Sequence, residues 1–147
     1  METKKEKGLE VTCQHPFTSN SNLPMGKQRS VIVYPFNEET IKKIVPDDIV
    51  CGNYMLGELD KDNMFSVFYV GRATKRKLKE RIAEHLKAYP TYSNVYFCFG
   101  EKTSEEEAYH QECKDYHDFL DVDGYLQNKD HPAKPEGMNI KCKVCNK

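Results

Sequence analysis

Residues 49–59, IVCGNYMLGEL, and residues 65–71, FSVFYVG, decide the fold of this chain. Both stretches are apolar and rich in aromatic or β-branched side chains, which favours extended strands. The turn-forming residues DKDN at 60–63 join them, and a connection this short suits an antiparallel pair. The two stretches therefore predict a β-hairpin that brings Tyr54 and Tyr69 into one small sheet.

Further elements follow the hairpin. Apolar residues recur every four positions from 78 to 86 and predict an amphipathic helix, which Pro90 ends. NVYFCF at 94–99 predicts a third strand, and capping-box spacing at 104–107 opens a long helix that runs to about residue 121. This order predicts an α+β fold with a small, mainly antiparallel three-stranded sheet flanked by helices.

The chain has 147 residues, enough for one compact domain. Residues 1–30 are polar and without a sustained apolar period, so we expect a flexible N-terminal arm. Residues 31–124 form the expected folded domain, in which VIVYPF at 31–36 predicts a short packing strand. Residues 125–147 are expected to form a loop-rich C-terminal tail, because they contain proline, glycine and no long apolar pattern.

Charge and hydropathy restrict the classes of function. The net charge is -1, so affinity for a polyanion needs a local basic patch. Residues 71–90 provide one, with seven Lys or Arg against two Glu, whereas the helix at 101–123 is strongly acidic and would repel DNA. The apolar runs are too short to span a bilayer, and METKKEKGLE does not look like a signal peptide. We therefore expect a cytoplasmic protein with no membrane partner and with free cysteines.

Three side chains on the expected helices could carry chemistry. Arg81 and His85 stand four residues apart at the edge of the apolar stripe, where they either face a cleft that binds phosphate or belong to a solvated basic face. Glu112 falls inside the apolar stripe of the long helix, so its carboxylate must be paired, protonated or bound to a cation. His110 and His117 on that helix are interpreted as surface or packing residues.

Several motifs occur together in an informative order. GNYMLGEL, FYVGRATKRKLKERIAEH and EEEAYHQECKDY resemble the GIY-YIG nuclease superfamily over a core of residues 49–121. Gly52-Asn53-Tyr54 matches the first motif, with Asn53 in place of an apolar residue, and Tyr69-Val70-Gly71 matches the second. The family's helical arginine falls on Arg81 and its metal-binding glutamate on Glu112.

The resemblance implies an endonuclease that hydrolyses phosphodiester bonds in DNA with one divalent cation, Mg²⁺ or Mn²⁺, on Glu112. Arg81 would stabilise the charge of the scissile phosphate, and Tyr54 would orient or deprotonate the attacking water, with His85 as the competing base. The implied catalytic set is Tyr54, Tyr69, Arg81, His85 and Glu112, and the implied phosphate-binding residues are Arg72 and Lys75. Packing in the core remains an equal interpretation for Tyr69.

Cys142-x-x-Cys145 in the tail is half of a tetrahedral zinc site. Cys13 and His15 are the first candidates for the other two ligands, and His131 is the next. A structural Zn²⁺ held by these residues would order the arm and the tail, whereas without metal the pair would be free thiols.

Two alternatives to a nuclease stay open. The same fold could serve as a non-catalytic module that binds nucleic acid or protein, since no separate DNA-binding region is evident. The chain could instead be a zinc-stabilised interaction protein whose motif matches are accidental.

Overall fold

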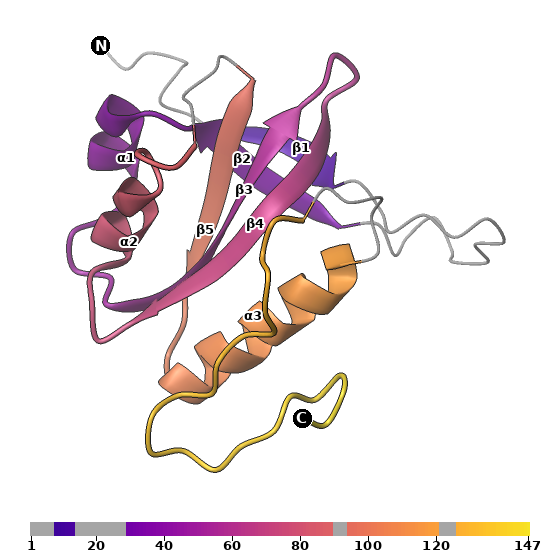
Figure 1. Ribbon diagram of the computed structural model, residues 1–147. Coiled ribbons are helices and arrows are strands. Elements are labelled where there is room, and N and C mark those ends of the chain that lie inside the picture. The colour runs from indigo at the N-terminus through magenta and orange to yellow at the C-terminus, as the bar shows by residue number, and fades with distance from the viewer. Residues whose placement is uncertain (1–7, 14–28, 90–93, 121–125) are drawn as a thin grey trace, which may run out of the picture.

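The computed structural model describes residues 8–13, 29–89, 94–120 and 126–147 (Figure 1). Within these ranges the elements, in chain order, are β1 (Leu9–Cys13), β2 (Ser30–Pro35), α1 (Glu38–Ile44), β3 (Cys51–Leu59), β4 (Met64–Thr74), α2 (Leu78–Glu84), β5 (Val95–Glu101) and α3 (Glu105–Leu120). None of the helices in the described ranges has the length and apolar character needed to cross a membrane.

The strands form one sheet in the order β1-β2-β5-β3-β4. Its neighbours are antiparallel, except that β1 and β4 form a short parallel pairing that closes the sheet on itself at one end. The predicted hairpin is β3–β4, in which Tyr54 lies opposite Gly71 and Leu56 opposite Tyr69. The α+β class and the mainly antiparallel sheet are confirmed.

The prediction of three strands is wrong, because five strands lie within the described residues. The run at 31–36 forms β2 and joins the same sheet as the hairpin. β1 lies inside the expected flexible arm, where only Val11 and Cys13 turn their side chains into the core. Two inward-facing residues in a polar segment are too weak a pattern to mark a strand. Residues 1–7 and 14–28 of that arm lie outside the described residues.

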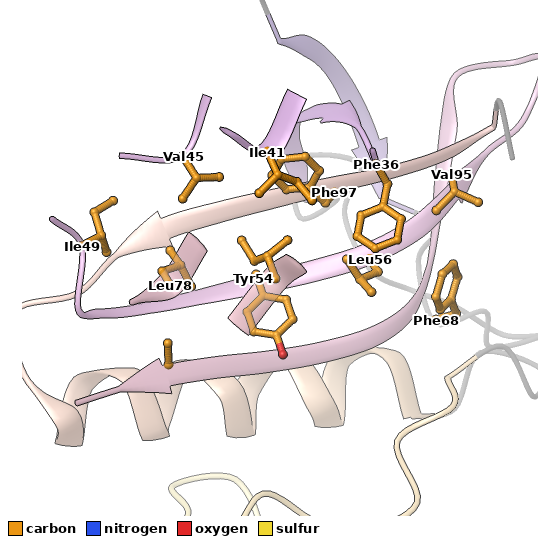
Figure 2. Close-up of a cluster of buried hydrophobic side chains, with 12 residues drawn as sticks. Phe36, Ile41, Val45, Ile49, Tyr54, Leu56, Phe68, Leu78, Val95 and Phe97 are labelled. Carbon is orange, nitrogen blue, oxygen red and sulfur yellow. The ribbon is translucent and has the colours of Figure 1, made fainter. Parts of the chain in front are cut away.

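Helices cover both faces of the sheet (Figure 1). α1 and α2 cover one face, over an apolar cluster to which β3 contributes Tyr54 and Leu56 (Figure 2). α3 covers the other face, where Met55 packs in a second cluster with Tyr116 and Phe119. The alternation of side chains along β3 therefore supplies both cores.

The helix ends follow local hydrogen bonds. α3 begins as predicted, since the Ser104 hydroxyl accepts the Glu107 N–H at 3.1 Å. α2 is shorter than predicted and ends at Glu84, because β4 continues to Thr74 and the residues after α2 form tight turns, in which His85 N–H bonds to Ile82 O at 3.1 Å.

The tail completes one edge of the sheet. The Asn128 side chain accepts the Val70 N–H at 2.9 Å and donates to the Val70 carbonyl at 2.8 Å. The Gln127 N–H donates to the Phe68 carbonyl at 2.7 Å. These bonds satisfy backbone groups of β4 that no strand reaches and hold the start of the tail against the hairpin.

Candidate active site

Gly71 allows Tyr54 to reach the edge of the sheet. A Cβ at position 71 would lie 2.4 Å from both Cζ and the hydroxyl oxygen of Tyr54, far inside van der Waals contact. The tyrosine ring therefore crosses β4 where β4 has no side chain, and its hydroxyl points toward that strand (Figure 2). The two motif triplets thus depend on each other sterically, because the glycine of one provides the space for the tyrosine of the other.

The Tyr54 hydroxyl and His85 Nε2 share a hydrogen bond of 2.7 Å. Burial raises the pKa of Tyr54 above its ordinary value, and the positive charge of Arg81 opposes that rise. Burial and the nearby Arg81 charge together lower the pKa of His85 to about 4. At neutral pH the phenol is protonated and the imidazole neutral, so His85 is the proton acceptor of the pair.

An aromatic cluster surrounds this hydrogen bond. The Tyr69 ring stacks on Tyr54 at 6.2 Å between centroids and lies 4.5 Å from the His85 ring. Tyr89 packs against both Tyr69 and His85, at 6.1 Å and 5.8 Å. Sequence reasoning did not select Tyr89, although it follows His85 by four residues, one helical turn later. These contacts give Tyr69 a packing role that holds the Tyr54 and His85 rings in place.

Arg81 and Glu112 line the same pocket, although they come from helices on opposite faces of the sheet. The pocket measures about 270 Å³ and lies beside the end of β4. Its lining consists of Arg72, Ala73, Thr74, Arg76, Arg81, Glu112 and Ala133. Arg81 Nη1 donates to Glu84 Oε1 at 3.1 Å, and the Arg81 side chain remains 30% exposed. A guanidinium and a carboxylate thus face one concave site.

Asn53 accounts for the position of Glu112. Its side-chain amide donates to the Ala108 carbonyl at 2.9 Å and is buried between β3 and α3. Ala108 precedes Glu112 by one helical turn, so this bond fixes where that part of α3 packs against β3. Asn53, which stands where the GIY-YIG motif has an apolar residue, therefore links β3 to α3 through its side-chain amide.

Arg72 contacts Glu112 directly. Its Nη1 donates to Glu112 Oε1 at 2.5 Å, and its Nη2 donates to the Ala133 carbonyl at 2.6 Å. Burial raises the pKa of Glu112, while the charges of Arg72 and Arg81 oppose that rise. The sequence predicts Arg72 as a phosphate ligand, and the structure places it between the glutamate and the tail. Ala133 was not predicted, since a backbone carbonyl leaves no signature in a sequence.

Lys75 is separate from this pocket. It adopts a left-handed backbone with φ 67°, its side chain is 71% exposed, and its Nζ lies 3.8 Å from a Glu105 carboxylate oxygen. Arg76 lines the pocket instead and forms an ion pair with Glu84. Because of the turn after β4, the neighbouring cation faces the site and Lys75 faces solvent.

Among the expected zinc ligands that the structure describes, Cys13 does not belong to the cluster that contains Cys142 and Cys145. Cys13 lies on β1 within the second core cluster, and burial raises the pKa of its thiol to about 11. Cys13 therefore acts as an apolar packing residue and keeps its thiol proton at neutral pH. His15 lies outside the described residues. Cys142 and Cys145 instead lie near two histidines, His117 and His131, with one donor atom of each of the four within 4.8 Å of the others.

Comparisons with protein-family models, curated proteins and solved structures found no match to this chain. The likeness to GIY-YIG nucleases therefore depends on the motif residues alone.

Proposed function

We propose that this protein is a metal-dependent endonuclease that hydrolyses phosphodiester bonds in DNA. The supporting observation is the pocket shared by Arg81 and Glu112, with the hydrogen-bonded Tyr54–His85 pair nearby. The charge of Arg81 lowers the pKa of both Tyr54 and His85, so the guanidinium lies within electrostatic range of that pair. An arginine and an acid that line one cavity, with a proton acceptor near that arginine, are the groups that phosphodiester hydrolysis needs.

The donor set suits one hard divalent cation. Glu112 offers a carboxylate at the pocket wall, and its contact with Arg72 uses one of its two oxygens. Mg²⁺ commonly takes one or two protein carboxylates and completes its shell with water and substrate phosphate. Bound there, Mg²⁺ would polarise the scissile phosphate and stabilise the leaving oxygen.

The chain's own residues supply the remaining functions. Arg81 donates hydrogen bonds to the phosphate as negative charge accumulates on its oxygens, which stabilises the transition state more than the ground state. The neutral His85 accepts the phenol proton of Tyr54 while the phenol oxygen takes a proton from the attacking water. In this relay the phenol transfers a proton without remaining ionised, and His85, whose pKa lies near 4, passes that proton on to solvent or to the leaving oxygen.

Arg72 provides charge balance in the state described here. Its guanidinium neutralises a glutamate whose side chain is 12% exposed, and that pairing stabilises the pocket before substrate arrives. Arg72 is therefore a positioning residue for Glu112 in this proposal rather than a phosphate ligand.

The test is nicking of supercoiled plasmid by the purified protein with Mg²⁺. We expect Glu112→Gln and Arg81→Ala to lower the rate at least 100-fold, the usual scale for a lost transition-state contact. Glu106→Gln is the matched control, since Glu106 lies on the same helix with an exposed carboxylate that pairs with His110. Equal cutting by Glu112→Gln and wild type would refute the proposal.

A second function is a non-catalytic module that binds nucleic acid on the same fold. The observation that favours it is the Arg72–Glu112 ion pair, which neutralises the acid without a cation. This function predicts salt-dependent DNA binding in metal-free buffer and no cleavage with Mg²⁺ or Mn²⁺. Cleavage that disappears in Glu112→Gln excludes it.

A further inference from the structure

Two histidines and two cysteines converge where the tail crosses α3. His117 comes from the last turns of α3, and His131, Cys142 and Cys145 come from the tail. Cys145 Sγ and His131 Nε2 are 3.4 Å apart. With Zn–S of about 2.3 Å and Zn–N of about 2.0 Å at a tetrahedral angle, the expected S···N separation is about 3.5 Å. The observed spacing matches a shared metal.

Neighbouring hydrogen bonds leave the histidine nitrogens and cysteine sulfurs of this cluster oriented for metal binding. His131 Nδ1 lies 3.0 Å from the Pro132 carbonyl, so a proton on Nδ1 leaves Nε2 free as a ligand. Val144 N–H donates to Cys142 Sγ at 3.4 Å, which fixes the position of the sulfur. His117 Nε2 is buried and has no hydrogen-bond partner among the described residues. A bound cation would satisfy this nitrogen, which otherwise stays buried without a partner.

We propose that His117, His131, Cys142 and Cys145 bind one Zn²⁺ in a structural site. Two imidazoles and two thiolates are a common zinc ligand set, and four protein ligands fill the tetrahedron, leaving no position open for a reacting molecule. His117 and His131 thus take the places that the sequence assigned first to Cys13 and His15. The CxxC signature showed half of the site, and only the packing of the tail on α3 revealed the other half.

The metal would explain how the tail keeps its position. The structure shows no helix or strand in residues 126–147. The apolar cluster at the end of this segment contains only Cys142 and Ile140 from the tail, packed against Tyr109 and Cys113. This is little apolar surface for holding a polar segment in one conformation. Zinc ligation between a helix and a loop supplies the missing constraint.

The site also bears on the pocket, and this step depends on the proposed function. His131 stands two residues before Ala133, whose carbonyl holds Arg72, which in turn holds Glu112. Loss of zinc would release the Ala133 carbonyl and with it one support of the Arg72–Glu112 pair. We therefore expect a zinc-depleted protein to cleave DNA more slowly without a change in the ligands for Mg²⁺.

The test begins with metal content of the full chain, purified with reduced thiols, measured by elemental mass spectrometry. We expect one zinc ion per chain, and after exchange with Co²⁺ the visible absorption bands of a tetrahedral thiolate complex. His117→Gln and Cys145→Ser should weaken zinc binding at least 10-fold, as judged by competition with a chromophoric chelator. His110→Gln, on the same helix, and Cys51→Ser, outside the cluster, are the matched controls and should bind zinc as wild type does.

Limited proteolysis gives a second readout for a variant that folds poorly. Removal of zinc should expose the tail to cleavage while residues of the sheet remain protected, and added Zn²⁺ should restore protection. Zinc content far below one per chain with no cobalt spectrum would overturn the proposal, and so would full zinc retention in both ligand variants. All these measurements are made without DNA, so failure of the nuclease proposal leaves them unaffected.

Discussion

Substitution of Gly71 by alanine tests the steric link between the two motif strands. The added Cβ would lie 2.4 Å from the Tyr54 ring and hydroxyl, where ordinary contact begins at about 3.4 Å. The ring must therefore move by about 1 Å. Tyr54 is only 1% exposed and its ring is stacked on Tyr69, so the ring cannot shift without disturbing its packing.

Two effects set the size of the stability loss expected for Gly71→Ala. Overpacking in a well-packed core costs about 1–3 kcal/mol. A shift of about 1 Å also breaks the 2.7 Å bond between Tyr54 and His85, which contributes about 1 kcal/mol. We expect Gly71→Ala to lower the free energy of unfolding by about 2–4 kcal/mol. With a urea m-value of about 2 kcal/mol/M, the denaturation midpoint should fall by about 1–2 M.

Urea denaturation followed by circular dichroism measures the effect, and Gly100→Ala is the matched control. Gly100 is also a strand glycine, but a Cβ there would meet nothing within 4 Å. That control should change stability by less than about 0.5 kcal/mol. Equal midpoints for Gly71→Ala and Gly100→Ala would refute the steric argument, and so would wild-type plasmid nicking by Gly71→Ala at a temperature where it is folded.

Two further predictions concern pH and a buried acid. The His85 pKa lies near 4 when folded and about 6.5 when unfolded, so its contribution to stability is complete above pH 6.5 and is lost as pH falls toward 4. Over that interval the free energy of unfolding of wild type should fall by about 1–2 kcal/mol more than that of His85→Gln, after allowance for the partial solvent access of His85. Denaturation at each pH measures this difference. Parallel plots of stability against pH for the two proteins would contradict the prediction. Arg29→Ala should lower stability by about 3 kcal/mol at pH 7, because it leaves the 2%-exposed Asp115 without the ion pair at 2.9 Å. The loss of stability should be smaller in the double variant Arg29→Ala/Asp115→Asn. An Arg29→Ala variant as stable as wild type would disprove the prediction.

The hairpin and the long helix were predictable because their signals are local. Apolar strand residues flank a short turn at 60–63, and the hydroxyl of Ser104 lies where a helix needs a cap. Strand β1 was not predictable, since Val11 and Cys13 become core residues only after β2 and β4 lie beside them. The formation of β1 therefore depends on tertiary contacts and not on a local sequence pattern.

The motifs indicated which residue types belong to the candidate site, but not how they are arranged. Spacing alone placed Arg81 and Glu112 on two helices, whereas the shared pocket depends on how α2 and α3 pack at the end of β4. The role of Arg72 depends on Ala133, which lies 61 residues away in the chain. Such a contact has no local pattern.

By itself the sequence determined the class of fold, the β3–β4 hairpin, and the identity of the side chains able to perform acid–base or phosphate chemistry. These features depend on periodicity, turn residues and chemical type, all of which are properties of neighbouring residues. Only the tertiary structure decided which groups meet, as when it brought His117 to the Cys142–Cys145 pair and placed Cys13 in the core. The physical reason is that these contacts form when the chain buries its apolar faces, and burial is a property of the whole fold.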